Sequence, residues 1–124
     1  MNVHEGPHRI STFLLNQELL PCMIVSNEPG YYENGNFGIR IENLLEIVEK
    51  PEFGTFGGCG FLGFKRLTHI PIQKKMIVIE LLSDIELKWL NDYHQEIKEK
   101  VTPYLTSIES KSWLDECTSP MKRI

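Results

Sequence analysis

Residues 23–43 read MIVSNEPGYYENGNFGIRIEN, and this stretch predicts two short strands joined by a turn-rich loop. We expect the first strand at Met23–Asn27, where an apolar run begins, and the second at Phe37–Asn43. Asn34-Gly35 lies between them, and Asn-Gly is the strongest short turn signal that a sequence can carry. The stretch therefore predicts a hairpin-like return of the chain.

One glutamate closes the apolar part of each predicted strand. Glu28 ends the first strand and is followed at once by Pro29-Gly30, and Glu42 ends the alternating run of the second strand. Arg40 and Glu42 share one face of that second strand, because side chains two residues apart point the same way. Carboxylates at neighbouring strand ends can present oxygen ligands to a metal ion. By spacing alone, however, two solvent-exposed glutamates are the commoner interpretation.

The composition is that of an ordinary globular protein. The 124 residues, of which 41% are hydrophobic, suffice for one domain with a core. The formal net charge is 13 − 17 = −4, which argues against nucleic acid as the main partner, since that partner favours a basic surface. No run approaches the roughly 20 apolar residues of a membrane span, and no signal peptide is recognisable. We therefore expect a cytoplasmic protein with free thiols at Cys22, Cys59 and Cys117.

Further strands are predicted from the apolar runs that follow. We expect Leu44–Glu49 to be a strand that pairs with the run Met76–Leu81. We expect Leu67–Ile72 to be a further strand, whose proline suits an edge or a bulge. Residues 50–63 hold five of the nine glycines. A phosphate-binding loop would need a Gly-Lys-Ser/Thr ending or a strand-to-helix context, and neither is present. We interpret this segment as a flexible surface loop held by its phenylalanines.

Two helices are predicted in the C-terminal part of the chain. Ser83-Asp84-Ile85-Glu86 matches a capping box, in which a serine and a glutamate satisfy each other's backbone N–H groups. The helix that follows is expected to end before Pro103, and a second, shorter helix to run from about Tyr104 to Cys117. An apolar stripe at helical period marks the core side of the first helix: Leu90, Tyr93, Ile97 and Val101, extended by Ile85 and Trp89.

Four segments together resemble a known peptidase family. They are NVHEGP at 2–7, the stretch at 23–43, THIPIQKKMI at 68–77 and LKWLNDYH at 87–94. The chain resembles the Xaa-Pro aminopeptidases (aminopeptidase P), and within them the C-terminal part of the catalytic domain of the large eukaryotic cytosolic members. The resemblance implies an α+β fold, namely the C-terminal half of a pita-bread fold with antiparallel strands followed by C-terminal helices. It also implies a partial metallopeptidase catalytic domain at residues 1–101 and a helical extension at 102–124.

The resemblance implies a site with two metal ions, usually manganese, that removes an N-terminal residue preceding proline from a peptide. Glu28 and Glu42 match two metal-binding glutamates of the family, of which the second bridges both ions. A glutamate at position 28 can also act as general base. Oxygen ligands suit a hard ion such as Mn²⁺.

Three further positions of this site are implied by the resemblance. His4 matches a histidine that lies beside the substrate and helps to stabilise the transition state. Arg40 matches an arginine whose ion pair supports the metal-binding carboxylates. Either Tyr31 or Tyr32 is expected to line the same cavity.

The family's two aspartate ligands and its histidine ligand precede the HEGP motif, whereas the first aspartate of this chain is Asp84. We therefore expect three of five ligands to be absent, weak Mn²⁺ binding, and no activity of the chain alone, as in a truncated peptidase. An open alternative is a non-catalytic folding or association module that dimerises or complements another chain. Another is an unrelated binding module that works through its glycine-rich loop. A half-domain exposes a sheet edge and apolar surface, so we also expect a homo-oligomer.

Overall fold

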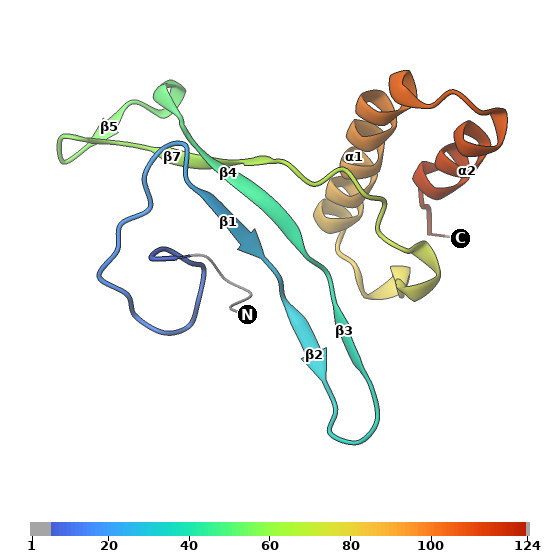
Figure 1. The fold of residues 1–124 in the computed structure, drawn as a ribbon, viewed down its shortest axis with the longest axis horizontal. Helices are drawn as coiled ribbons and strands as arrows, with labels where there is room; N and C mark the ends of the chain where they lie inside the picture. Colours follow the sequence, from blue (N-terminus) through green and yellow to red (C-terminus); the bar gives the residue numbers. More distant parts are fainter. Residues whose placement is uncertain (1–5, 124) are drawn as a thin grey trace. The chain divides into compact units, whose positions relative to one another are not determined.

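The computed structural model describes residues 6–123, which form two compact units, one up to Thr68 and one from His69. The first unit consists of antiparallel strands and the second of helices (Figure 1). This order confirms the predicted α+β class with strands first and helices last.

A three-stranded antiparallel sheet is the centre of the first unit. It consists of β1 (Ile24–Asn27), β4 (Asn43–Glu49) and β7 (Leu62–Arg66), in the order β1-β4-β7. Val25 and Ile47 are 4% and 2% exposed and lie on the same face of the sheet, since Val25 pairs with Leu45 and side chains two residues apart share a face. These two buried side chains mark the covered face of the sheet.

The predicted hairpin is confirmed. Strands β2 (Gly30–Tyr32) and β3 (Gly38–Arg40) pair antiparallel and continue β1 and β4 along the chain (Figure 1). The Glu33 N–H donates to the Phe37 carbonyl at 2.8 Å, so the loop holds three residues, with Gly35 at φ 70°. That left-handed conformation is the one that glycine adopts at no steric cost.

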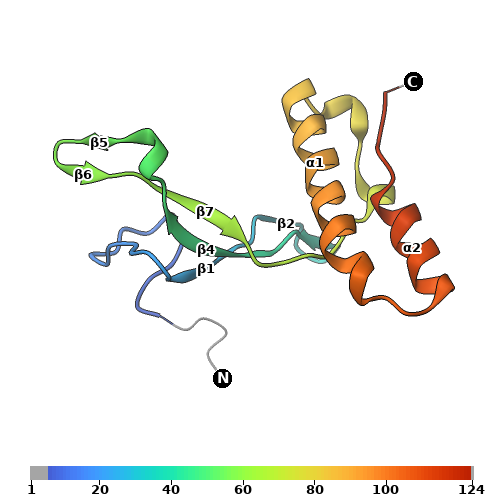
Figure 2. The same ribbon diagram turned by 90° about the horizontal axis from the view of Figure 1, so that it is seen from above.

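The glycine-rich segment at 50–63 is more ordered than expected. It contains a short helical turn, η1 (Pro51–Phe53), and a small hairpin of β5 (Thr55–Phe56) and β6 (Cys59–Gly60) (Figure 2). The rings of Phe53 and Phe61 meet edge to face at 6.2 Å, as aromatic side chains that hold a surface segment should. The prediction of a flexible loop was wrong, because the segment forms a helical turn and a hairpin. The prediction of a surface position agrees with the exposure of all the residues of this hairpin.

Two predicted strands were wrong. The neighbours of β4 are β1 and β7, and the run Met76–Leu81 instead forms two helical turns, η2 (Lys74–Met76) and η3 (Ile79–Leu81). The run Leu67–Ile72 forms no strand beyond the end of β7.

Side chains of a helix take the place of a partner strand for that run. The Tyr93 hydroxyl donates to the Ile70 carbonyl at 2.8 Å, and the Ile72 N–H donates to Nε2 of His94 at 3.1 Å. Pro71, which lies between these two residues, has no N–H to donate.

The second unit contains α1 (Asp84–Val101), η4 (Thr102–Tyr104) and α2 (Ile108–Thr118). The predicted capping box is confirmed, since Ser83 Oγ accepts from the Glu86 N–H at 3.3 Å and the Ser83 N–H donates to the Glu86 carboxylate at 2.7 Å. The second helix begins later than expected, because η4 and a short loop follow α1.

The core of the second unit follows the predicted stripe only in part. Tyr93 and Ile97 of α1 are buried against Leu114 of α2, and Ile72, Val101 and Leu105 pack around them. Ile85, which was expected to extend the stripe, is 83% exposed, and Trp89 is half exposed. Among residues 6–123, no helix has the length and apolar character needed to span a membrane.

Candidate metal-site hairpin

Glu28 and Glu42 face each other across the hairpin. In β1 and β4, Asn27 pairs with Asn43, and in β2 and β3, Gly30 pairs with Arg40. Between these two pairs, each side of the hairpin has two residues, so Glu28 lies opposite Glu42 and Pro29 lies opposite Ile41. The two ladders share one register, and both carboxylates therefore lie on the same face.

Pro29 explains why the ladder is interrupted at this point. The Ile41 N–H donates to the Pro29 carbonyl at 3.2 Å, but a proline has no N–H with which to return the bond. Pairs that exchange backbone bonds alternate with pairs that do not, so Glu28 and Glu42 form a non-hydrogen-bonded pair. Side chains approach most closely in pairs of that type.

Two carboxylates opposite each other repel unless a cation compensates them. Arg40 lies on the same face, and its Nη1 donates to Oε2 of Glu28 at 2.7 Å. The Glu28 side chain is 21% exposed and the Arg40 side chain 49%. The ion pair therefore joins a partly covered carboxylate to an exposed guanidinium, and solvent screens it as it does other surface pairs.

Tyr32 holds the arginine from the other side. Nε of Arg40 donates to the Tyr32 hydroxyl at 2.7 Å, and the guanidinium carbon lies 5.8 Å from the centre of the Tyr32 ring. This hydrogen bond and the interaction with the Tyr32 hydroxyl, followed by the charges of Glu28 and Glu42, raise the pKa of Arg40. The guanidinium is thus a permanent cation beside the two carboxylates.

Two glycines make room for that arrangement. A Cβ atom on Gly30 would lie 2.5 Å from the Tyr32 hydroxyl oxygen, and one on Gly38 would lie 2.7 Å from Cδ1 of the same ring. The tyrosine ring therefore covers the two glycines, and only residues without a side chain leave that space.

Tyr31 points away from this cluster. Side chains alternate along a strand, so Tyr31 lies on the opposite face from Tyr32. It is 58% exposed, and its ring contacts Phe37 at 5.9 Å between centroids. Of the two tyrosines, Tyr32 is the one that lies with the carboxylates.

Ser26 was missed by the sequence reasoning. Its Oγ donates to Oε1 of Glu28 at 2.7 Å, from a partly buried position two residues earlier on the same strand. The spacing could have revealed it, because residues two apart on a strand share a face.

The remaining predicted residue, His4, lies outside the described residues. Among residues 6–123, no group of three or more histidine, cysteine, aspartate or glutamate side chains could hold a metal ion. These residues bring together two of the ligands that the resemblance implies, with an arginine, a tyrosine and a serine around them.

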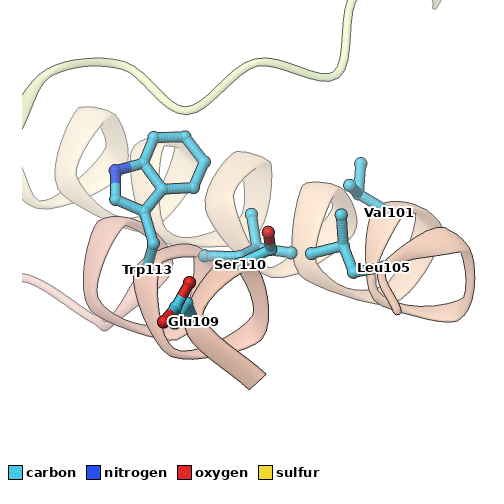
Figure 3. Close-up of a pocket in the computed structure, with 6 residues that line it drawn as sticks. Val101, Leu105, Glu109, Ser110 and Trp113 are labelled. Carbon is cyan, nitrogen blue, oxygen red and sulfur yellow. The ribbon is translucent and has the colours of Figure 1, made fainter. Parts of the chain in front are cut away.

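A separate hollow of about 370 Å³ lies between the helices of the second unit. Figure 3 shows the Trp113 indole along one side of it and Val101 with Leu105 at the other end, while Glu109 and Ser110 supply the polar atoms. The wall is mostly apolar and contains none of the predicted site residues.

Comparison with known families identifies the class of protein. Residues 1–49 match metallopeptidase family M24, and residues 60–121 match the C-terminal region of peptidase M24. The chain belongs to the M24 metallopeptidases.

Individual relatives are Xaa-Pro aminopeptidases. The chain is 51% identical to aminopeptidase P2 of Arabidopsis thaliana, over 99% of this chain and 18% of that protein. It is 47% identical to a probable Xaa-Pro aminopeptidase P of Coprinopsis cinerea, over 98% of this chain and 20% of the relative. The chain thus spans about a fifth of the length of these relatives.

A solved structure supports the same assignment. X-prolyl aminopeptidase from Caenorhabditis elegans, described as a cytosolic enzyme with a di-nuclear active site, matches with a TM-score of 0.71 and 34% sequence identity. The match covers 83% of this chain and 17% of that one. The predicted family and the pita-bread fold are thereby confirmed.

Proposed function

We propose that this chain contributes Glu28 and Glu42 to the dinuclear metal centre of an Xaa-Pro aminopeptidase, which hydrolyses peptides with proline in second position. The observation that carries the proposal is the register, which sets the two carboxylates opposite each other on one face. Carboxylates rarely occupy such a pair without a cation between or beside them.

The donor atoms fit a hard divalent ion. Both donors are carboxylate oxygens, which suit Mn²⁺ better than a thiol-preferring ion. Two carboxylates are too few for a tight site, so further ligands must come from outside residues 6–123. The 124-residue chain alone is expected to bind Mn²⁺ weakly and not to hydrolyse peptides.

Each residue of the hairpin has a role in this proposal. Glu28 and Glu42 would hold the metal ions, and Glu28 would accept the proton of the attacking water. Arg40 compensates the carboxylates, and Tyr32 fixes the plane of the guanidinium. His4 would act beside the substrate. Bound metal ions would supply the Lewis acidity that polarises the scissile carbonyl and lowers the pKa of water.

Other parts of the proposal rest on the relatives. The Caenorhabditis elegans enzyme is described as cytosolic, which supports a cytoplasmic location for this protein. A division into a catalytic part at 1–101 and a helical extension at 102–124 stays a prediction.

A second candidate function, association with another polypeptide surface, is favoured by exposed apolar residues on the face that carries Glu28. Ile24 and Leu44 lie on that face and are 52% and 44% exposed. Apolar side chains grouped on one face of a sheet suit a partner surface, either a second copy or a complementing chain.

A titration with Mn²⁺ tests the metal proposal even if binding is weak. In ¹⁵N NMR spectra of the 124-residue chain, paramagnetic broadening should be centred on the backbone around Glu28 and Glu42. The substitutions Glu28→Gln and Glu42→Gln should each remove it. Glu49→Gln is the matched control, because Glu49 is an exposed glutamate of β4 on the opposite face of the sheet.

Two results would contradict the proposal. Broadening centred elsewhere, or unchanged by both substitutions, would exclude the hairpin as a metal site. Turnover of an Xaa-Pro peptide by the chain alone with Mn²⁺ would overturn the claim that further ligands are needed.

A further inference from the structure

The two oxygens of Glu28 are held by donors on different strands. Oε1 accepts from the Ser26 hydroxyl of its own strand at 2.7 Å, and Oε2 accepts from Nη1 of Arg40 on the opposite strand at 2.7 Å. Each oxygen of the carboxylate therefore accepts a hydrogen bond from a different side chain.

Without the serine, Oε1 of Glu28 would lose a hydrogen-bond donor. A guanidinium favours a two-bond fork with a carboxylate, in which both oxygens turn toward it. Here the donors of Arg40 serve two different acceptors, since Nε donates to the Tyr32 hydroxyl while Nη1 donates to Glu28. The Ser26 bond opposes a rotation of Glu28 that would turn Oε1 toward the guanidinium.

The position of Ser26 on the sheet makes Glu28 the acceptor for its hydroxyl. Ser26 pairs with Leu44 across the ladder, so the residue directly opposite it offers no side-chain acceptor. Glu28 is two residues along the same face and is within reach of a side chain as short as serine. The hydroxyl is partly buried, which limits competition from water.

We infer that Ser26 is a positioning residue that fixes the rotamer of the metal-site carboxylate Glu28. The expected effect of Ser26 on metal binding rests on the proposed function. The expected effect of Ser26 on the Glu28 rotamer does not. The bond holds Oε1 of Glu28 beside Ser26, on the face of the sheet that also carries Glu42. Loss of the hydroxyl would leave the carboxylate chemically intact and wrongly oriented.

Ser26→Thr and Ser26→Val form the decisive pair, because their side chains have nearly the same shape and only threonine keeps the hydroxyl. With ¹³C-labelled glutamate in the 124-residue chain, three-bond couplings of Glu28 report its rotamer in the absence of metal. We expect one dominant rotamer in wild type and Ser26→Thr, and averaged couplings in Ser26→Val and in a second variant, Ser26→Ala.

Mn²⁺ binding provides the second readout. Residues that orient a ligand typically contribute about 10-fold or more to metal affinity, so the concentration of Mn²⁺ that broadens the Glu42 amide should rise by about that factor in Ser26→Val. It should stay at the wild-type value in Ser26→Thr. Amide spectra of β1 and β4 verify that each variant keeps the sheet, and Ser26→Ala serves if valine disturbs it.

The outcomes separate this inference from the proposed function. Wild-type couplings in both Ser26→Val and Ser26→Ala would overturn the inference. Averaged couplings together with unchanged Mn²⁺ affinity would overturn its consequence for the metal site. Absence of broadening near Glu28 and Glu42 in the wild type would instead contradict the proposed function, while the metal-free couplings would still decide the role of Ser26.

Discussion

The Ile41 N–H donates to the Pro29 carbonyl at 3.2 Å, and Pro29 cannot return the bond. The imino acid therefore interrupts an otherwise continuous ladder without shifting its register. The interruption lies next to the two glutamates.

Pro29→Ala should join the two ladders. Alanine supplies an N–H that can donate to the Ile41 carbonyl, and such a bond contributes about 0.5–1.5 kcal/mol. Loss of the proline costs about 0.4–1 kcal/mol through the unfolded chain, so overall stability should change little. Hydrogen exchange should find the new backbone amide of this variant protected. A freely exchanging amide would mean that another feature separates the ladders.

Gly38→Ala should displace the Tyr32 ring. The new Cβ would lie 2.7 Å from Cδ1 of the ring, so the ring must rotate and release Nε of Arg40. Arg40 is exposed to solvent, so the loss of this hydrogen bond should change the overall stability little. The Arg40 Nε–H resonance should shift as it does in Tyr32→Phe.

Gly60→Ala is the matched control for that substitution. Gly60 also lies in a strand, β6, and a Cβ there meets no atom within 4 Å. The Arg40 resonance should not move in this variant. An unchanged resonance in Gly38→Ala would contradict the proposed packing of the ring over the glycines.

His94 should make the second unit less stable in acid. Burial, with the nearby charge of Lys74, lowers the pKa of His94 below its ordinary value of 6.5. Below pH 6.5 the unfolded chain therefore binds a proton that the folded chain does not, so stability is complete above pH 6.5 and falls as the pH drops toward the folded pKa. The decline is at most about 1.4 kcal/mol per pH unit.

Urea unfolding between pH 5 and pH 7.5, followed by helical circular dichroism, measures this dependence. His94→Gln is the control, because an amide oxygen can still accept from the Ile72 N–H but does not titrate. The difference between wild type and variant should decrease in acid. Parallel pH profiles would show that His94 does not contribute.

Ser83→Ala should destabilise α1 by about 1 kcal/mol, the usual cost of losing a serine N-cap. Ser83 accepts from the Glu86 N–H, and the reciprocal bonds from Ser83 lower the pKa of the Glu86 carboxyl. The midpoint of urea unfolding measures the loss. Ser112→Ala, at an exposed position within α2, should be neutral or slightly stabilising. Equal effects of the two substitutions would contradict a capping role.

Local signals were sufficient where neighbouring residues determine the structure. Asn34-Gly35 indicated the hairpin, and Ser83 with Glu86 indicated the first turn of α1, because both signals act within four residues. The run at 67–72 was misassigned because its hydrogen-bond partners include the side chains of Tyr93 and His94. An apolar run shows that a segment is covered but not what covers it.

Several residues of the candidate site were predictable from the sequence, but Ser26 and the geometry were not. The resemblance supplied Glu28, Glu42 and Arg40, whereas their arrangement depends on the length of the loop. A two-residue Asn-Gly turn would place Glu28 opposite Ile41, and the third residue, Asn36, brings it opposite Glu42. Sequence alone does not decide between these loops, since both are common in hairpins.

The single register of the hairpin also bears on how the first unit folds. The cross-strand pairs run in one series from Glu33 and Phe37, next to the turn, to Met23 and Ile47. Each pair encloses the pair before it. Such nested contacts keep sequence separations short, and short separations favour fast folding. Zipping from the turn must cross Pro29, where one backbone bond is missing, before it reaches Val25. The step that brings Glu28 and Glu42 together is therefore accompanied by one backbone bond fewer than the steps on either side of it.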